Sequence, residues 1–263
     1  MKIIDIDRAI TALLMLCTVV MLGVFFTSSK AWGGGNNNSG FGFGSTRVIV
    51  TPEEKKGALV STVNNSDAVY LIQSRVVRAD GLSGEPQSKP SEEPLPFVVT
   101  PPLQRSEPHS VQSFRVLTVP GKPLPKDRES LFFLMAKAIP TTPEAQDGKG
   151  VRVVIALQQF IKLFYRPEGL SVDAINRGLV APKLTLSRSG NQLKVTNPTP
   201  YHVTFKKLSV NGKALEPQAL RAMVPPNGSQ AYALPEGVTN GKAEWQIIDE
   251  YGLDTPVVQA VVH

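Results

Sequence analysis

Between residues 46 and 167, runs of apolar and β-branched residues alternate with polar residues, and each run is bounded by Gly, Pro, Asn or Asp. This alternation is typical of β-strands that bury one face, because successive side chains of a strand point to opposite sides. It predicts strands over residues 46–50, 57–65, 68–81, 96–103, 110–121, 129–140 and 151–167. Short strands at close spacing favour an all-β fold, and in particular an immunoglobulin-like β-sandwich.

The strand pattern starts again after the short Pro-Glu-Gly-Leu stretch at residues 167–170. It predicts an N-terminal immunoglobulin-like domain over residues 46–168 and a C-terminal β-sandwich domain over residues 169–263. Because the joint is short, the two domains are expected to meet at a defined angle. The polar stretch at residues 79–96, rich in Pro and Ser, is interpreted as a mobile surface loop and not as a site.

The N-terminal part of the chain has a different pattern. An apolar run over residues 9–26 is followed by the small residues Ser29 and Ala31, so residues 1–31 are predicted to be a cleaved signal peptide. The run is longer than the apolar core of most signal peptides, and an uncleaved membrane anchor therefore stays an alternative. Residues 32–45, rich in Gly and Asn, are predicted to be flexible.

The formal net charge is +6 and the pI is about 9.4, which would suit nucleic acid, an anionic membrane or an acidic partner. The sequence has no block of five or six like charges and no helical stretch rich in Lys and Arg. The charge is therefore interpreted as a solvated basic surface, and no nucleic-acid partner is predicted. The single cysteine, Cys17, lies within the predicted signal peptide, which would leave the mature chain without a disulfide.

The sequence contains none of the common motifs of enzymes or metal sites. The histidines His109, His202 and His263 lie in unrelated stretches, and His202 is interpreted as a surface residue at a strand edge. The sequence therefore predicts a protein that is not an enzyme and that uses no metal and no cofactor.

The predicted strand over residues 151–167 carries cations on one of its faces. Its end, Ile-Lys-Leu-Phe-Tyr-Arg-Pro, places apolar side chains on one side and two cations with a phenylalanine on the other, namely Ile161, Leu163 and Tyr165 opposite Lys162, Phe164 and Arg166. A cation in such a strand must reach water or an anion, because a buried unpaired charge is very costly. The pattern therefore raises the question of which anions Lys162 and Arg166 meet.

Several motifs of the chain together resemble one family. TRVIV, NNSDAVYLIQSRV, FVVTPPL, LPKDRESLFFLMAKAIP and IKLFYRP occur in order in the first domain, and DEYG follows in the second. These stretches resemble the periplasmic chaperones of the chaperone–usher pilus pathway, the PapD-like family.

This resemblance implies two immunoglobulin-like domains in a boomerang arrangement. It also implies a periplasmic chaperone that binds, folds and caps pilus (fimbrial) subunits by donor-strand complementation and delivers them to an outer-membrane usher. The subunit is an incomplete sandwich, and the chaperone lends an edge strand to fill its groove. When free, the chaperone is expected to shield that edge, and self-association is one way to do so.

The resemblance also assigns roles to residues. It implies that Arg47 and Lys162 bind the terminal carboxylate of the subunit, and that Arg166 pairs with Glu129 and Glu250 across the domain interface. Glu250 stands where the family shows aspartate, so this network is expected to be looser. The lent strand is expected to present Val151, Val153, Ile155 and Leu157.

Two other classes of protein stay open at this point. A structural pilus or surface β-sandwich protein should carry an N-terminal extension of alternating apolar residues, which residues 32–45 do not supply. An extracytoplasmic ligand-binding module would leave Arg47 and Lys162 unexplained.

Overall fold

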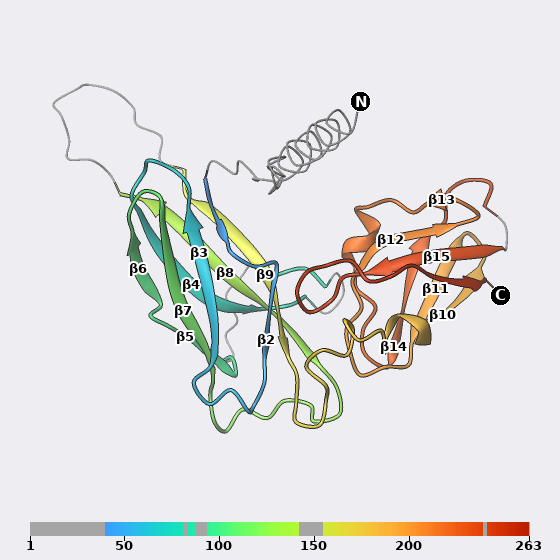
Figure 1. Cartoon of the computed structure of the whole chain (residues 1–263), viewed down its shortest axis with the longest axis horizontal. Helices are drawn as coiled ribbons and strands as arrows, with labels where there is room; N and C mark the ends of the chain where they lie inside the picture. Colours follow the sequence, from blue (N-terminus) through green and yellow to red (C-terminus); the bar gives the residue numbers. More distant parts are fainter. Residues whose placement is uncertain (1–39, 81–83, 88–93, 142–154, 239–240, 263) are drawn as a thin grey trace, which may run out of the picture. The chain divides into compact units, whose positions relative to one another are not determined.

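Figure 1 shows the computed structural model of the chain, which describes residues 40–80, 84–87, 94–141, 155–238 and 241–262. These residues form β-strands and turns together with two short 3-10 helices, η1 (Ala181–Lys183) and η2 (Ala219–Arg221). The prediction of an all-β protein is therefore confirmed. Within the described residues, no helix has the length and apolar character needed to cross a membrane.

The first domain consists of two β-sheets (Figure 1). A four-stranded sheet has the order β1-β3-β7-β5, and a five-stranded sheet has the order β2-β9-β8-β4-β6. The strands are β1 (Phe41–Phe43), β2 (Arg47–Val50), β3 (Ala58–Asn64), β4 (Tyr70–Arg78), β5 (Phe97–Thr100), β6 (Leu103–Ser106), β7 (Ser110–Thr118), β8 (Ser130–Pro140) and β9 (Leu157–Tyr165). Neighbouring strands run antiparallel, except that β2 runs parallel to β9.

The core of this domain lies between the two sheets, because alternate residues of each strand point inward. The four-stranded sheet contributes Val60, Phe114 and Val116, and the five-stranded sheet contributes Val50, Leu134 and Leu163. The alternation that predicted the strands is thus the alternation that builds the core.

Strand β1 corrects the prediction that residues 32–45 are flexible. Phe41–Phe43 pair with β3, and Phe41 is buried with its ring centroid 6.2 Å from that of Tyr70. The sequence Phe-Gly-Phe is itself a short alternating pattern, which the surrounding Gly-rich composition hides. The sandwich therefore begins before the predicted start at residue 46. Residues 32–39 and the predicted signal peptide lie outside the described residues.

The second domain contains a three-stranded sheet, β10-β11-β14, and a four-stranded sheet, β13-β12-β15-β16. Its strands are β10 (Thr185–Ser189), β11 (Gln192–Asn197), β12 (Phe205–Val210), β13 (Lys213–Ala214), β14 (Gly228–Ala233), β15 (Lys242–Ile247) and β16 (Val258–Val261). The buried ring of Trp245 donates a hydrogen bond from Nε1 to the carbonyl of Ala181 at 3.2 Å, which fixes η1 against the core.

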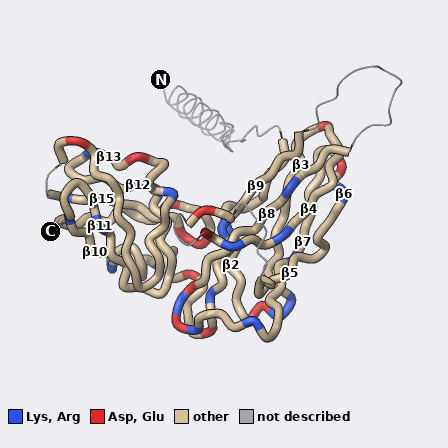
Figure 2. The backbone as a smooth tube through the Cα atoms, turned by 180° about the vertical axis from the view of Figure 1, so that it is seen from behind, with Lys and Arg blue, Asp and Glu red and all other residues tan. Residues whose placement is uncertain are grey.

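Figure 2 shows Lys and Arg interspersed with Asp and Glu along the described backbone, with no stretch dominated by one sign. The described residues also hold no group of three or more His, Cys, Asp or Glu side chains that could bind a metal ion.

Candidate functional site

At the end of β9, successive side chains point to opposite faces of the strand, as the alternation predicts. Ile161 and Leu163 belong to the core of the first domain, and Tyr165 packs against it. Phe164 points the other way, because its ring lies 5.7 Å from that of His202 in the second domain. Lys162 and Arg166 flank Phe164 on this side of the strand, so both cations face the second domain.

Arg47 and Lys162 are neighbours because β2 and β9 run parallel with these two residues in register. The Arg47 side chain crosses to the second domain, where Nη1 donates to the carbonyl of Ile248 at 3.1 Å. Its guanidinium carbon lies 5.9 Å from the centroid of the Phe164 ring. The Nε of Arg47 is buried and has no hydrogen-bond acceptor among the described residues. Arg47 is 9% exposed, so this donor has lost water without gaining a partner.

Lys162 also reaches the second domain, where Nζ donates to Oγ1 of Thr204 at 3.2 Å. Burial, followed by repulsion from Arg47, lowers the pKa of Lys162 from 10.5 to about 8, against a smaller opposing effect of Glu85. Among the described residues, neither Lys162 nor Arg47 forms an ion pair with a carboxylate. Within the part of the chain that the structure describes, the two adjacent cations thus have no carboxylate in ion-pair contact.

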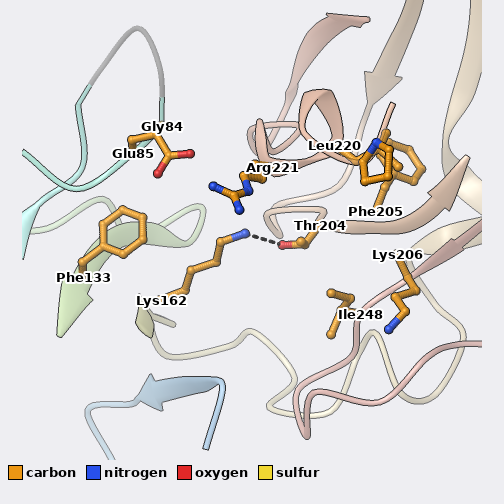
Figure 3. Close-up of a pocket in the computed structure, with 11 residues that line it drawn as sticks. Gly84, Glu85, Phe133, Lys162, Thr204, Phe205, Lys206, Leu220, Arg221 and Ile248 are labelled. Carbon is orange, nitrogen blue, oxygen red and sulfur yellow. Dashed lines mark hydrogen bonds between the residues drawn. The ribbon is translucent and has the colours of Figure 1, made fainter. Parts of the chain in front are cut away.

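Lys162 lines a pocket of about 350 Å³ that is built from both domains (Figure 3). The first domain contributes Glu85 and Phe133 besides Lys162, and the second contributes Thr204, Leu220, Arg221 and Ile248, among others. Apolar side chains thus surround a small number of charged groups, as is usual in ligand sites. Arg47 is not among the residues that line the pocket.

Arg166 lies in a different environment from that of Lys162. Its Nε and Nη2 donate to Oε1 of Glu129 at 2.8 and 2.6 Å, and its Nη1 donates to Oε1 of Glu250 at 3.1 Å. Nη1 also donates to the carbonyl of Ser171 at 2.8 Å, and the guanidinium carbon lies 4.8 Å from the centroid of the Tyr201 ring. The structure thus brings Arg166, Glu129 and Glu250 together, and all three side chains are buried.

The two carboxylates of this network have further donors. Glu250 accepts hydrogen bonds from the backbone amides of Ile175 and Asn176 at 2.9 and 2.8 Å, so both of its oxygens are bonded. The longer side chain at this position therefore does not leave a gap on the Arg166 side.

Glu129 has His202 as its second partner. Its Oε2 accepts the backbone amide of His202 at 2.7 Å and lies 3.3 Å from Nδ1 of the ring. Burial disfavours ionisation of Glu129, but the hydrogen bond from His202 and the charge of Arg166 outweigh it and lower the pKa. The interpretation of His202 as a surface residue is wrong, because its side chain is only 11% exposed.

Comparisons with known proteins match these domains in order. Residues 40–171 match the family described as pili and flagellar-assembly chaperone, PapD N-terminal domain, and residues 179–258 match the pili assembly chaperone PapD, C-terminal domain. The chain belongs to the PapD family of pilus-assembly chaperones.

Named relatives of this pilus-assembly chaperone include the probable fimbrial chaperone protein ElfD of Escherichia coli K12. It is 34% identical over 239 residues, which are 91% of this chain and 93% of ElfD. The chaperone protein FocC of Escherichia coli is 35% identical over 225 residues, 85% of this chain and 91% of FocC. The function of the chain is accordingly that of a fimbrial chaperone in chaperone–usher pilus assembly, and the family is not enzymatic.

Solved structures of similar chaperones cover both domains. The Escherichia coli chaperone DraB has a TM-score of 0.68 and 32% identity, over 84% of this chain and 96% of DraB. The Salmonella enterica SafB chaperone, solved in complex with the SafA pilin, has a TM-score of 0.69 and 29% identity, over 84% of this chain and 96% of SafB. These likenesses support the prediction of two immunoglobulin-like domains.

The segment expected to act as the lent strand is partly described. Ile155 and Leu157 are 70% and 39% exposed, whereas Val151 and Val153 lie outside the described residues. Strand β9 pairs with β8 from Leu157 onward, but its pairing with β2 begins only at Lys162. Among the described residues, no strand therefore pairs with the other edge of β9 ahead of Lys162.

Sequence reasoning missed several residues of this region. Thr204, Arg221 and Glu85 line the pocket of Lys162, although the stretch that contains Glu85 was interpreted as a surface loop and not as a site. No motif marks any of them. They reach the pocket only through the contact between the two domains, which local alternation does not encode.

Proposed function

We propose that this fimbrial chaperone anchors the C-terminal carboxylate of a pilus subunit on Arg47 and Lys162. The observation that carries the proposal is that these adjacent cations lack a carboxylate partner among the described residues, and that Arg47 keeps a buried, unbonded Nε. A carboxylate offers lone pairs to both cations at once, and charge-assisted hydrogen bonds of this kind are strong and fix geometry. An anion at this point would thus complete two side chains that the free protein leaves incomplete.

The lent strand in this proposal presents Val151, Val153, Ile155 and Leu157 to the subunit. Its support is the exposure of Ile155 and Leu157 and the unpaired edge of β9 ahead of Lys162. An exposed strand edge with apolar side chains is prone to association, and a subunit strand would satisfy both its backbone and its side chains. A carboxylate held at Lys162 would set the register of that pairing.

The Arg166 network has a structural role in this proposal. Because it connects Glu129 of the first domain with Glu250 and Ser171 of the second, it holds the end of β9 against the second domain. This fixes the position from which Lys162 meets the carboxylate. Of the five N–H groups of Arg166, four already donate hydrogen bonds, to Glu129, Glu250 and the carbonyl of Ser171.

The cellular setting follows from the same function. Residues 1–31 would direct export to the periplasm, the loaded chaperone would deliver its subunit to an outer-membrane usher, and the free chaperone would cover the β9 edge by self-association. The relative SafB, which was solved with the SafA pilin, supports the assignment of a subunit as the partner.

The anchor is tested with a short peptide of alternating valine and threonine, prepared with a free C-terminal carboxylate and as the C-terminal amide. The wild-type protein should bind the acid more tightly. Arg47→Ala and Lys162→Ala should each weaken binding of the acid by about 30-fold or more, because loss of one partner of a buried charge pair costs about 2–5 kcal/mol. Binding is measured by calorimetry, with folding checked by circular dichroism.

The matched control for these variants is Arg188→Ala, which removes an exposed cation of β10 that bonds only the carbonyl of Gly190. It should bind both peptides as the wild type does. Equal binding of acid and amide by the wild type, or an unchanged preference in both Arg47→Ala and Lys162→Ala, would contradict the carboxylate anchor.

A further inference from the structure

The pocket beside Lys162 contains charged side chains to which the anchor assigns no role. Of the two anchor cations only Lys162 lines this volume, whereas the buried Arg47 donates to the carbonyl of Ile248 and lies against the ring of Phe164. A carboxylate that enters the pocket therefore meets Lys162 first. The other charged groups that it can meet come from the second domain and from the segment after β4.

Arg221 is the cation of the second-domain wall. It is the last residue of η2, where the preceding Leu220 is buried in the core of the domain and Arg221 itself is exposed. Figure 3 shows its guanidinium directed toward the end of the Lys162 side chain. Lys206, another cation of the lining, lies 3.7 Å from Asp254, whereas Arg221 makes no ion pair among the described residues.

Glu85 is the anion of the opposite wall. The backbone amide of Asp80 donates to the carbonyl of Glu85 at 2.7 Å, and the amide of Gln87 donates to the carbonyl of Arg78 at 3.0 Å. These bonds continue the antiparallel pattern beyond β4 and hold Glu85 in position. Figure 3 shows its carboxylate on the side of the pocket opposite Arg221, directed toward the same space.

We propose that the terminal carboxylate of a subunit, held by Lys162 next to Arg47, also meets Arg221, and that the Glu85 carboxylate competes with it for Lys162 and Arg221. The proposal rests on the carboxylate anchor and adds the two residues that set its strength. Arg221 attracts the incoming anion, and its planar guanidinium suits a carboxylate better than a single ammonium does. Glu85 repels the same anion while the pocket is loaded, because like charges disfavour binding.

The two residues have opposite functions in this arrangement. A chaperone must hold its subunit and later release it, so an acid that is always present across from the anchor keeps the bound state from becoming too stable. Because Glu85 belongs to the first domain and Arg221 to the second, the balance also depends on both domains being in place.

Substitutions of the two residues should therefore have opposite signs. With the valine–threonine peptide acid as the probe, Glu85→Gln should tighten binding and Arg221→Ala should weaken it, each by about two- to fivefold, as for partly solvated charge pairs. The amide form of the peptide should be unaffected by either change. Both effects should shrink as the salt concentration rises, because exposed charges are screened.

Matched controls separate a local effect from one of net charge. Glu54→Gln alters charge as Glu85→Gln does, but on an exposed turn between β2 and β3, and Arg188→Ala matches Arg221→Ala. Both controls should bind like the wild type. Because all four side chains are exposed, thermal unfolding of the variants should stay close to that of the wild type.

The outcomes distinguish this inference from the anchor on which it rests. If Lys162→Ala abolishes the preference for the acid but Glu85→Gln and Arg221→Ala behave like their controls, the anchor stands and the inference is overturned. If Arg47→Ala and Lys162→Ala both keep the preference, the anchor itself fails. An Arg221→Ala variant that loses acid and amide alike would show contact with the peptide and not with its carboxylate, and would also overturn the inference.

Discussion

Arg166 and the pair of Arg47 and Lys162 lie at the same end of β9 and face the same second domain, yet their surroundings are opposite in kind. Arg166 donates to two carboxylates and a carbonyl, and it stacks on Tyr201. Among the described residues, Lys162 donates to one hydroxyl, that of Thr204, and Arg47 donates to one carbonyl, that of Ile248, while its Nε has no acceptor. Arg166 thus has carboxylate partners within the described part of the chain, whereas Arg47 and Lys162 form no ion pair there.

This difference supports the proposal that Arg166 has a structural role and that Arg47 and Lys162 have a binding role. A buried cation is tolerable when its donors are matched, as they are around Arg166. A buried cation without a carboxylate in contact destabilises the free protein, and Arg47 and Lys162 have no such contact among the described residues. This uncompensated cost in the free protein is the physical basis of the proposal that an external anion binds to Arg47 and Lys162.

The largest effect on stability is expected from the removal of Arg166. Arg166→Ala would leave Glu129 and Glu250 buried without their cation, and removal of one partner from a buried ion pair costs about 3–5 kcal/mol. Urea unfolding should show this loss as a lower midpoint. Lys162→Ala should show little loss or a gain, because it removes a buried charge that lacks an anion.

The control for this experiment is Arg177→Ala, which breaks an exposed ion pair with Asp173 and should change the free energy of unfolding by less than about 1 kcal/mol. Should Lys162→Ala destabilise the protein as much as Arg166→Ala does, the distinction between a completed and an incomplete charge group would be lost.

The fold could be predicted largely because alternation is a local property of the chain. Leu163 and Lys162 alternate in the sequence, and the structure places one in the core and the other on the opposite face. The prediction failed at Phe41, because two aromatic residues among many glycines carry too short a pattern to distinguish a strand from a flexible segment. Only its pairing with β3 reveals the strand.

The site could be predicted only where a motif marks it. Arg47, Lys162 and Arg166 stand in stretches that resemble a family, and the structure brings them to the domain interface. His202, Glu85 and Arg221 stand in no such stretch. Their roles depend on which residues of the other domain they meet, and a contact across 73 residues of chain, such as that of His202 with Glu129, leaves no trace in a local pattern.

Binding of the peptide acid should depend on pH, because Lys162 loses its proton at a lower pH than an ordinary lysine. Since the pKa of Lys162 is about 8 in the free protein, its charge is lost as the pH rises above that value. Binding of the peptide acid should therefore weaken above pH 8, approaching tenfold per pH unit. Lys162→Arg stays charged and should bind with a flat profile over the same range.

The same lowered pKa has a consequence for stability. A lysine whose pKa falls from 10.5 to about 8 on folding favours the folded state when it is neutral. Its contribution is therefore present above pH 10.5 and is lost as the pH falls through 8. Between these values the free energy of unfolding of the wild type should rise relative to that of Lys162→Met, and parallel curves would show that Lys162 is not buried as described.

The smallest expected effect on stability lies at the exposed start of the same strand. Ile155 is 70% exposed, so Ile155→Asp should change the free energy of unfolding by no more than about 0.5 kcal/mol, as most surface substitutions do. Leu163→Asp is the matched control on β9, because Leu163 is fully buried and a carboxylate there should prevent stable folding. Urea unfolding measures the stability of both variants, and binding of the valine–threonine peptide acid is then measured for the variant that folds.

A native midpoint with weakened binding for Ile155→Asp would indicate that this segment contacts the subunit and does not belong to the core. A large loss of stability would instead mean that Ile155 packs within the protein. The segment ahead of Lys162 would then not be part of the proposed binding region.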